Sequence, residues 1–426
     1  MVLNADVDDL INTAISILVS ANTIKSFLAE KNLPQPSILN DPSPALFAPE
    51  LDAARDDILN ACHKVQALIS APVHTFGMGL QAHYLDLGVF QWVHHFKVAQ
   101  AVPLDKTITF EELASATGTP IDILRRMVRY SMTSFVFHEP QPGYVAHTAR
   151  SRLLLDSSAI SLCDLTAEWL FHCADQFAPA VEKWPGSQEL NETSYNLSLK
   201  TDLPFFQFIS QKPAAVAKFG KLMMSFAAGQ DWIMKEVAQE CRWNDLGKAT
   251  LVDVGGSIGH TSMVIADVVP DFDFVVEDLP EVVQQGQKVL LENRPELKDR
   301  FNFLAHNFFE PQTSDGDIYL LRCILHDYPD KYAIKIVENL LPALKKKNGT
   351  RMVIYERIVP LPGAVSVLQE RLVRAQDIQM WSCFNSKERE LEEWKELVAK
   401  VDPGLKLTKV VTPHGSLYSA MEFMFY

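Results

Sequence analysis

Short runs of apolar residues alternate with longer segments of helical periodicity in the C-terminal half of the chain. Strands that alternate with helices in this way are typical of a mostly parallel sheet covered on both faces. Only Thr412–Ser416 separates the last two runs, so we expect them to form an antiparallel hairpin at the edge of the sheet. The predicted strands are 250–255, 272–277, 301–305, 317–322, 351–356, 405–411 and 417–425.

The N-terminal part of the chain has a mainly helical pattern instead. Apolar residues such as Leu10 and Leu18 recur there at helical spacing, and these stripes need a partner surface. We therefore divide the chain into a helical domain, 1–185, and a second domain, 186–426. The polar stretch 185–200 is predicted to be a surface connection rather than core.

Within the first domain, the segment 107–154 predicts a helix, a turn, a second helix and a two-stranded wing. A winged helix could bind DNA, and Arg125, Arg126 and Arg129 on the second helix could contact phosphates. Because the whole chain is acidic, we favour a structural or dimerising module. This domain is thus expected to be winged-helix-like.

Composition and charge narrow the classes of function. Lys plus Arg number 39 against 53 Asp plus Glu, and a formal net charge of −14 disfavours binding to nucleic acid. The six cysteines lie far apart, with no Cys-x-x-Cys pair and no short Cys/His cluster, which predicts reduced thiols and no metal site. Acids at Asp6, Asp8 and Asp9 are unlike a signal peptide, and no apolar run has the length of a membrane span. We expect a soluble cytoplasmic protein with no membrane contact.

A glycine-rich turn follows the first predicted strand. Gly255 and Gly256 allow a sharp turn and close approach of a ligand to bare backbone, and the helix expected from His260 directs free N–H groups at an anion. Asp278, just past the second strand, can accept both hydroxyls of a ribose. The glycines alone could serve close packing, but together with Asp278 they favour a mononucleotide-binding unit.

A second group of chemically useful residues surrounds His326. This residue follows the strand 317–322, Glu356 ends the next strand, and Glu388 is placed at the start of a helix. Carboxylates beside an imidazole fix its orientation and stabilise its protonated form, as a general base requires. A lone histidine is more often structural, Glu356 could form a strand-end salt bridge, and Glu388 could be an acid at a helix N-terminus. Ligands of such sheets bind beyond the carboxyl ends of the strands, where we expect Gly255, Asp278, His306, Asn307 and Arg322.

In their order and spacing these motifs resemble those of the plant caffeate-type and fungal secondary-metabolite O-methyltransferases. The motifs are Asp253–Gly259, Asp278–Pro280, His306–Phe309, Arg322–Pro329, Glu356 and Phe384–Arg389. The resemblance is strong over about 215–426, and 80–160 is similar to the family's winged-helix dimerisation region. It implies an α/β fold with the Rossmann-like class I methyltransferase sheet of seven strands, and a homodimer formed through the N-terminal helices.

The resemblance also implies S-adenosylmethionine in the crevice. By this likeness the glycine turn, with Gly255 and Gly256, lies near the amino-acid part of the cofactor, and Arg322 holds the carboxylate of that part. Asp278 and Leu279 lie at the ribose. Asn307 and Phe308 lie at the adenine. Asn307 stands where the family usually has an acid. An amide oxygen can accept the same hydrogen bond but brings no charge, so the affinity for the cofactor could differ.

His326 matches the general base of that family, and Glu356 and Glu388 match its supporting acids. Met223 matches a methionine that clamps the substrate, and Met380 lies in a helix that lines the acceptor pocket. Such an enzyme would methylate a phenolic or enolic hydroxyl of a polyketide-like secondary metabolite. His326 would take the hydroxyl proton, and the oxyanion would attack the sulfonium methyl group in line.

The sequence indicates only the general character of the acceptor molecule. Aromatic residues suggest a planar or apolar molecule, and they are Trp169, Phe171, Phe177, Phe226, Trp381 and Phe384. Some fungal members of the family keep the cofactor without consuming it and direct dehydration or pericyclic ring formation. His172 would then be a donor to a substrate carbonyl, beside His326 and Arg322. Because the base and both acids are intact, we favour methyl transfer over a pericyclase, and over a non-catalytic sensor.

Overall fold

The computed structural model describes residues 9–40, 48–227 and 231–425, and these form two compact units. The first unit comprises Met1–His172, Lys212–Ser225 and Ser366–Leu368, and the second comprises Cys173–Gln211, Phe226–Val365 and Gln369–Tyr426. Within the described ranges, no helix combines the length and the apolar character that crossing a membrane requires.

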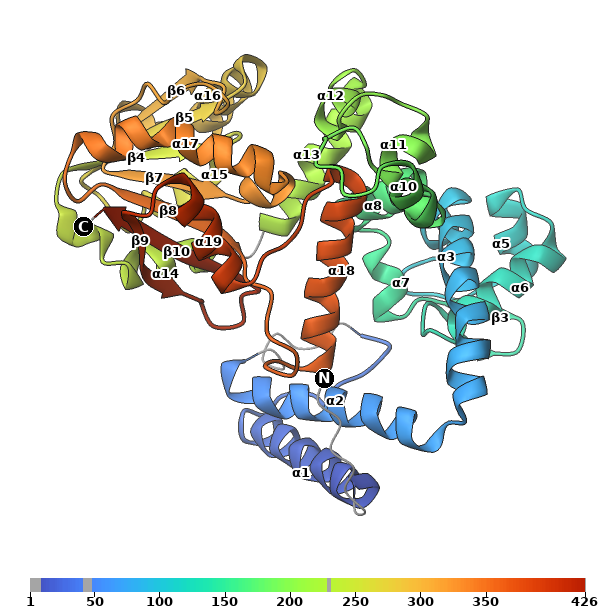
Figure 1. Cartoon of the computed structure of the whole chain (residues 1–426). Coiled ribbons are helices and arrows are strands. Elements are labelled where there is room, and N and C mark those ends of the chain that lie inside the picture. Colours follow the sequence, from blue (N-terminus) through green and yellow to red (C-terminus); the bar gives the residue numbers. More distant parts are fainter. Residues whose placement is uncertain (1–8, 41–47, 228–230, 426) are drawn as a thin grey trace. The chain divides into compact units, whose positions relative to one another are not determined.

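The first unit is mainly helical (Figure 1). Helices α1 and α2 pack on each other, and α5 begins at a capping box in which Thr109 and Glu112 bond each other's backbone N–H groups. Strands β1, β3 and β2 form a small antiparallel sheet in that order. The elements are α1 (Asp9–Glu30), α2 (Asp52–Ile69), α3 (Gly79–His95), α4 (Val98–Ala101), β1 (Ile108–Thr109), α5 (Phe110–Thr117), α6 (Ile121–Met132), β2 (His138–Gln141), β3 (Tyr144–Ala146), α7 (Ala149–Leu153), α8 (Ser157–Leu165) and most of α13 (Pro213–Ala227).

The segment 107–154 contains the predicted helix, turn, helix and two-stranded hairpin, with β1 as an additional strand. On α6, Arg129 forms a paired hydrogen bond with Glu139, and Arg125 bonds Glu111. Both guanidinium groups also lie over the ring of Phe110. These arginines are therefore engaged within the unit, which agrees with a structural role for the helix.

The second unit is built on a seven-stranded sheet in the order β6-β5-β4-β7-β8-β10-β9. Its central strands pair in parallel, and β10 runs antiparallel to both β8 and β9, so the expected edge hairpin is present. All seven predicted strands are confirmed to within one residue at each end. They are β4 (Ala249–Val254), β5 (Phe272–Asp278), β6 (Phe301–Ala305), β7 (Ile318–Arg322), β8 (Arg351–Arg357), β9 (Leu405–Val411) and β10 (Tyr418–Phe425).

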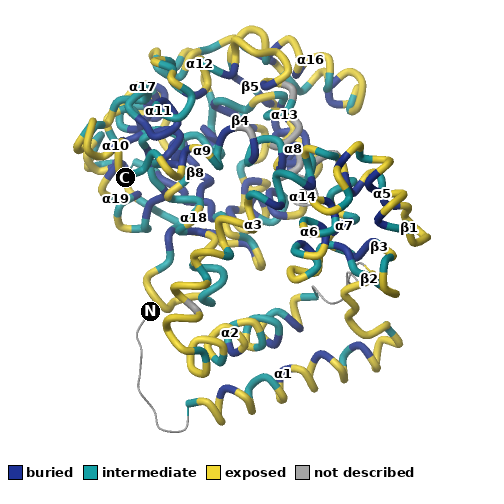
Figure 2. The backbone as a smooth tube through the Cα atoms, turned by 90° about the vertical axis from the view of Figure 1, so that its right-hand side faces the viewer, coloured by how far each residue is buried: buried dark blue, intermediate teal, exposed yellow. Residues whose placement is uncertain are grey.

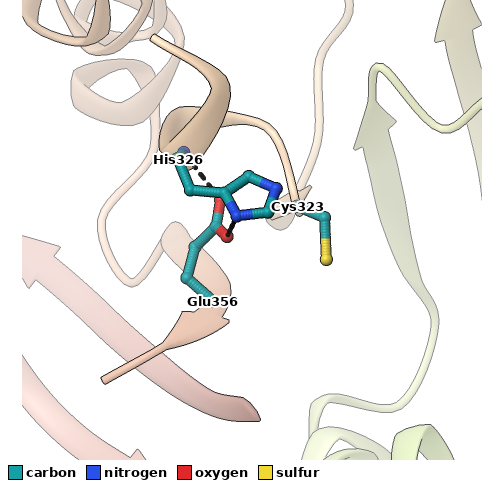
Figure 3. Close-up of side chains that lie close together, drawn as sticks. All are labelled: Cys323, His326 and Glu356. Carbon is teal, nitrogen blue, oxygen red and sulfur yellow. Dashed lines mark hydrogen bonds and ion pairs between the residues drawn. The ribbon is translucent and has the colours of Figure 1, made fainter. Parts of the chain in front are cut away.

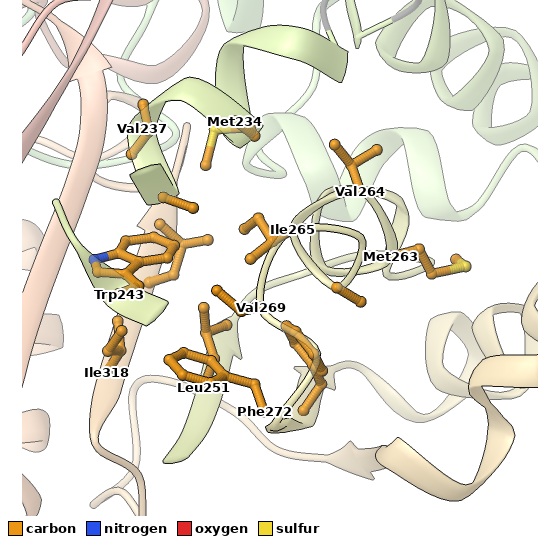
Figure 4. Packing of buried hydrophobic residues seen from close by; sticks show 14 of the residues in the cluster. Met234, Val237, Trp243, Leu251, Met263, Val264, Ile265, Val269, Phe272 and Ile318 are labelled. Atoms are coloured by element: carbon orange, nitrogen blue, oxygen red, sulfur yellow. The ribbon is translucent and has the colours of Figure 1, made fainter. Parts of the chain in front are cut away.

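Helices cover both faces of this sheet because the central strands are apolar on both sides. One face packs against α14, α15 and α16, in a core around Trp243 that also contains Leu251 and Phe272 (Figure 4). The other face packs against α17 and α19 through residues such as Val252 and Trp394. The remaining helices of the unit are α9 (Phe171–Cys173), which joins the two units, α10 (Phe177–Lys183), α11 (Ser194–Leu199), α12 (Phe205–Ser210), α14 (Asp231–Glu240), α15 (His260–Ile265), α16 (Pro280–Asn293), α17 (Asp330–Lys346), α18 (Val367–Phe384) and α19 (Leu391–Val401).

The prediction of a surface connection over 185–200 is wrong in its second half. Residues 194–199 form α11, which Thr193 caps, and Tyr195 is fully buried against Phe205 and Phe208. The side chain of Asn196 also bonds two carbonyl groups of the following loop. Polar side chains here satisfy buried backbone groups, so a polar composition was a poor guide to exposure.

Candidate active site

His326 lies on a short 3-10 turn, η8 (Leu325–Asp327), immediately beyond the carboxyl end of β7. The chain leaves the strand through Cys323, whose φ of 53° is left-handed and whose N–H donates to the carbonyl of Tyr355 on β8. The turn leaves His326 only 7% exposed. The imidazole is therefore largely removed from water at the end of the sheet where ligands of such folds bind.

Glu356 and Glu388 both reach the imidazole of His326. Figure 3 shows the contact with Glu356. Nδ1 lies 3.0 Å from Oε1 of Glu388 and 3.6 Å from Oε2 of Glu356. Glu356 also supports the turn, since its Oε1 accepts the N–H groups of Ile324 and Leu325, each at 2.9 Å. The structure thus brings the three predicted residues together from three separate segments.

Glu388 is not at the start of a helix, contrary to the sequence prediction. Helix α18 ends at Phe384 and α19 begins at Leu391, with Glu390 as its N-cap. Glu388 lies in the connection between them and is 2% exposed, and its carboxylate faces His326 and Arg357. The negative charge of Glu388 is therefore stabilised by the imidazole of His326 and the guanidinium of Arg357, and not by a helix N-terminus.

Buried charges around the imidazole decide its protonation. Burial alone would lower the pKa of His326, but Glu356, Asp327 and Glu388 outweigh it and hold the pKa well above the usual value. Burial raises the pKa of Glu356. Burial also acts to raise the pKa of Glu388, but the hydrogen bond from His326 and the charge of Arg357 lower it overall. Glu388 is thus the ionised partner of the ring.

This pairing determines which ring nitrogen can accept a proton. An ionised carboxylate only accepts hydrogen bonds, so the contact with Glu388 places the proton of a neutral imidazole on Nδ1. Nε2 then carries the lone pair, and Asp327 Oδ1 lies 3.6 Å from it. Burial raises the pKa of Asp327 to about 7, which His326 partly opposes. The arrangement can act as a general base through Nε2.

Cys323 also belongs to this cluster (Figure 3). Its Sγ, a ring nitrogen of His326 and an oxygen of Glu356 lie within 4.8 Å of one another. The sequence predicted no cluster of cysteine and histidine residues, and at this turn that prediction is wrong. Burial raises the pKa of the Cys323 thiol. A protonated thiol is a poor nucleophile and a poor metal ligand, so we assign it neither role.

Three supporting residues were missed by reasoning from the sequence. Arg389 is fully buried and donates to the carbonyls of Leu325 and Tyr328 and to Asp330, which pins both ends of the histidine turn. Arg357, next to Glu356 on β8, donates to Glu388. Asp377 on α18 accepts the N–H of Glu388 at 2.9 Å. Adjacency to Glu356 and Glu388 was the available signal for the two arginines; nothing in the sequence indicated Asp377.

The glycine turn after β4 has the conformation that the sequence predicts. Gly255 has a φ of +70°, a region that other residues rarely adopt. A Cβ on Gly256 would lie 2.5 Å from the carboxyl carbon of Asp253, which is itself buried and bonded by Ser262. Helix α15 begins at His260 as expected but has only six residues. Bare backbone therefore faces the carboxyl end of the sheet at this turn.

Polar groups beyond the sheet suit the polar parts of an adenosylated amino acid. Asp278 is held by the N–H of Ser257 at 2.8 Å and that of Leu279 at 2.7 Å, which leaves lone pairs for ribose hydroxyls. Burial raises the pKa of Asp278. The buried Nε of Arg322 has no hydrogen-bond partner among the described residues, so a carboxylate would satisfy it.

The residues expected at the adenine lie next to this crevice. Phe308 is half-buried, 3.5 Å from the position that a Cβ on Gly255 would occupy. Asn307 is exposed, and its Oδ1 accepts the N–H of Phe309 at 3.1 Å, while Leu279 is 50% exposed at the start of α16. The donor and acceptor set therefore fits S-adenosylmethionine, with Asn307 partly engaged by its own backbone.

Asp278→Asn is expected to weaken binding of S-adenosylmethionine by about 10- to 150-fold, since a hydrogen bond to a charged group contributes about 1.5–3 kcal/mol. Isothermal titration calorimetry measures this directly. Asp273→Asn, an exposed acid on the same strand, is the matched control and should bind as the unmodified protein does. Equal affinities for both variants would remove Asp278 from the cofactor site.

The expected acceptor residues fall in both units. Met223, which is 41% exposed, Phe171 and His172 belong to the first unit, where the rings of Phe171 and His172 contact each other. Met380 lies in the second unit and is 4% exposed within α18. The side chain of Phe226 lies outside the described residues. A cavity of about 500 Å³ in the second unit is lined by Trp184, Trp381 and Asp377, but not by Met380 or by the histidine cluster.

Comparison with known proteins identifies the family. The model of the O-methyltransferase domain matches residues 187–402. O-methyltransferase aoiF of Aspergillus oryzae is 37% identical over 401 residues, 92% of each chain, and O-methyltransferase pgmB of Aspergillus terreus is 36% identical over 423 residues, 96% of this chain and 94% of the relative.

Solved structures share the fold at lower identity. A structure titled "A Pericyclic Reaction enzyme" has a TM-score of 0.75 at 21% identity, and OxaC in complex with SAH and oxaline has a TM-score of 0.73 at 20% identity; each alignment covers 97% of this chain and 100% of the other. At these identities the likeness concerns the fold alone. With the family model and the close relatives, the sequence and site place this chain in the O-methyltransferase family.

Proposed function

We propose that the protein transfers the methyl group of S-adenosylmethionine to a phenolic or enolic hydroxyl of a small, polyketide-like secondary metabolite. The observation that carries this proposal is the hydrogen bond between Nδ1 of His326 and the ionised Glu388, which leaves Nε2 as a proton acceptor. Membership of the O-methyltransferase family and the fungal relatives support it.

The chain's own residues supply a base and a dry environment. His326 accepts the hydroxyl proton at Nε2, and the buried Glu388 and Glu356 stabilise the imidazolium that forms. Arg389 and Glu356 fix the turn, so the ring needs no reorganisation during the reaction. The cofactor, when bound, supplies an electrophilic methyl group on a positively charged sulfur. Positioning of two reactants can contribute roughly 7–11 kcal/mol, more than the base itself supplies.

A direct test follows the labelled methyl group. The protein is incubated with methyl-labelled S-adenosylmethionine and a panel of planar phenols and enols, and products are identified by mass spectrometry. We expect a labelled methyl ether and one equivalent of demethylated cofactor. A cyclised or dehydrated product with the cofactor unconsumed would overturn methyl transfer.

The pH dependence provides a further prediction. Because the neighbouring carboxylates raise the pKa of His326 well above 6.5, the ring gains its base form at higher pH than an ordinary histidine does. We therefore expect kcat/KM, which reports groups of the free enzyme, to rise with pH with a midpoint above 6.5. Asp327→Asn removes a carboxylate that raises this pKa, so its midpoint should move to lower pH.

The matched control for this profile is Asp315→Asn, an exposed acid that pairs with Lys346. Its midpoint should equal that of the unmodified protein. Ionisation of the substrate would give the same midpoint in all three proteins, and that result would contradict the assignment to His326.

We also propose a homodimer formed through the N-terminal helices, in a protein located in the cytoplasm. Figure 2 colours much of α1 as exposed. Five apolar side chains of this helix, Leu10, Ile11, Ile15, Leu18 and Val19, are 45–62% exposed. An apolar surface of this kind is typical of an interface. All six cysteines are free thiols, which supports a reducing compartment.

Charged substitutions on α1 test the dimer. Ile11→Asp combined with Leu18→Asp should convert a dimer into a monomer in sedimentation velocity, because each chain would have to bury two carboxylates at the interface. Leu291→Asp, on the exposed surface of α16 in the second unit, should leave the dimer intact. An unmodified protein that sediments as a monomer would refute this proposal.

A further inference from the structure

The second unit contains a preformed cavity of about 500 Å³ to which the proposed mechanism assigns no role. It lies between α10, the loop that follows it, the start of α17 and the end of α18. None of its lining residues is His326, Glu356 or Glu388. Its volume falls within the range of about 300–1,000 Å³ of sites that bind small molecules.

Hydrogen bonds hold the walls of this cavity in place. Asn385 donates through its amide to the carbonyls of Ser187 and Glu189, at 3.0 and 3.1 Å. Lys331 and Tyr332, on the first turn of α17, both bond the carboxylate of Glu189. The loop is thus fastened to α17 and to Asn385, the residue that follows α18. A ligand would meet a formed pocket and would not have to order the loop.

Two tryptophans provide most of the aromatic surface of the cavity. Trp381 packs edge-on against Phe177, with ring centroids 5.2 Å apart, so its orientation is set from behind. Trp184 already attracts a cation, since the ammonium of Lys183 lies 4.2 Å from its ring centroid. Indole rings are the strongest cation–π partners among side chains. The surface therefore suits an aromatic or alkyl group next to a positive charge.

The charges of the lining leave an unpaired carboxylate. Lys387 is neutralised by Glu393 at 2.6 Å, and Asp330 is neutralised by Arg389 at 2.8 Å. Asp377 forms no ion pair with any residue that the structure describes; its hydrogen bond is to the N–H of Glu388. Burial, and the nearby carboxylates of Glu388 and Glu393, raise the pKa of Asp377. A cation in the cavity would relieve this repulsion.

A second polar group lacks a partner at the same wall. Ser386 is only 4% exposed, and its Oγ has no hydrogen-bond partner among the described residues. A buried hydroxyl without a partner is costly, and a ligand with N–H donors would satisfy it. Glu192 adds a further carboxylate to the lining. The cavity therefore has aromatic walls, an acid without an ion-pair partner and a hydroxyl acceptor without a donor. These groups match the apolar part, the positive charge and the N–H donors of an organic ammonium ion.

We propose that this cavity binds a small organic ammonium compound, with its apolar part against Trp184 and Trp381 and its charged nitrogen at Asp377 and Ser386. The site connects to the histidine cluster, because Asp377 holds the backbone of Glu388 and Glu388 holds the imidazole. The ammonium group could belong to the methyl acceptor or to a separate molecule, and the recognition chemistry is the same for both.

The test uses two probes of nearly equal size, phenethylamine, which is a cation at neutral pH, and 2-phenylethanol, which is neutral. Calorimetry on the full-length protein without acceptor should show the cation binding at least tenfold more tightly. Asp377→Asn keeps an acceptor for the N–H of Glu388 but removes the charge, so it should abolish this preference. Asp315→Asn, a remote exposed acid, should leave it unchanged.

Other outcomes decide the proposal as clearly. Equal binding of both probes, no binding of either at millimolar concentration, or an unchanged preference in Asp377→Asn would overturn it. Ser386→Ala gives a second measurement and should weaken the cation alone. Inhibition of methyl transfer identifies the source of the ammonium group: competition with the acceptor places it on the acceptor, and non-competitive behaviour places it on a separate ligand. Binding of the two probes is measured without turnover. A protein that did not transfer methyl groups could therefore still show the predicted preference for the cation, so the two proposals can fail separately.

Discussion

Replacement of His326 by alanine is expected to lower kcat by about 10²- to 10⁴-fold, the usual contribution of a general base. Affinity for S-adenosylmethionine should remain unchanged, because Asp278 and Arg322, the residues that we propose bind the cofactor, are untouched. Loss of the imidazole also leaves Glu388 without its main partner, so part of the effect is electrostatic. Single-turnover kinetics with saturating cofactor separates the chemical step from binding.

His63→Ala is the control for this experiment, because His63 is exposed on α2 in the first unit. It should retain full activity. Added imidazole should restore part of the activity of the His326 variant and have no effect on the control. A His326 variant that turns over at the full rate would remove the base assignment altogether.

Arg389→Met should destabilise the protein by several kcal/mol, because each of the two carbonyls that loses its donor costs about 1–3 kcal/mol. The guanidinium is fully buried, bonds Asp330 and two carbonyls of the histidine turn, and lies 4.9 Å from the ring centroid of Trp394. Methionine replaces the apolar stem but none of the donors. Urea unfolding measures the free energy, and kcat should fall with it because the turn loses its anchor.

Arg242→Met provides the comparison on the surface. Arg242 pairs with Asp245, but its side chain is 77% exposed, and such pairs contribute at most about 1 kcal/mol. If both variants unfolded at the same urea concentration, Arg389 would have no special structural role. A stable Arg389 variant with normal kcat would also show that the turn is held by Glu356 alone.

The architecture of the second unit was predictable from the sequence because apolar runs and glycine positions are local signals. The strands that contain Leu251, Phe274 and Leu320 are buried on both faces, and such strands read as continuous apolar runs. The antiparallel edge followed from the short Thr412–Ser416 connection. These features depend on neighbours in the chain, which a single sequence displays.

The site was predictable only in part, since its supporting contacts join distant segments. His326, Glu356 and Glu388 could be named, but their convergence depends on the connection between α18 and α19. Glu388 looked like a helix N-terminal acid, yet the helix begins three residues later. Arg389 ends one of the motifs, but the motif does not show that its guanidinium reaches Asp330 and the carbonyls of the histidine turn. Asp377 belongs to no motif, because its partner is a backbone N–H that any sequence offers.

The side chain of Glu356 has a structural role that does not depend on catalysis. Its Oε1 takes up N–H groups of the turn at 324 and 325 that would otherwise have no acceptor. A descendant that abandoned catalysis would still be stabilised by a carboxylate there, because the two N–H groups need an acceptor. Its retention in a relative is therefore a poor marker of a working enzyme, and genome surveys that seek active members should instead examine the imidazole at 326 and the acid at 388.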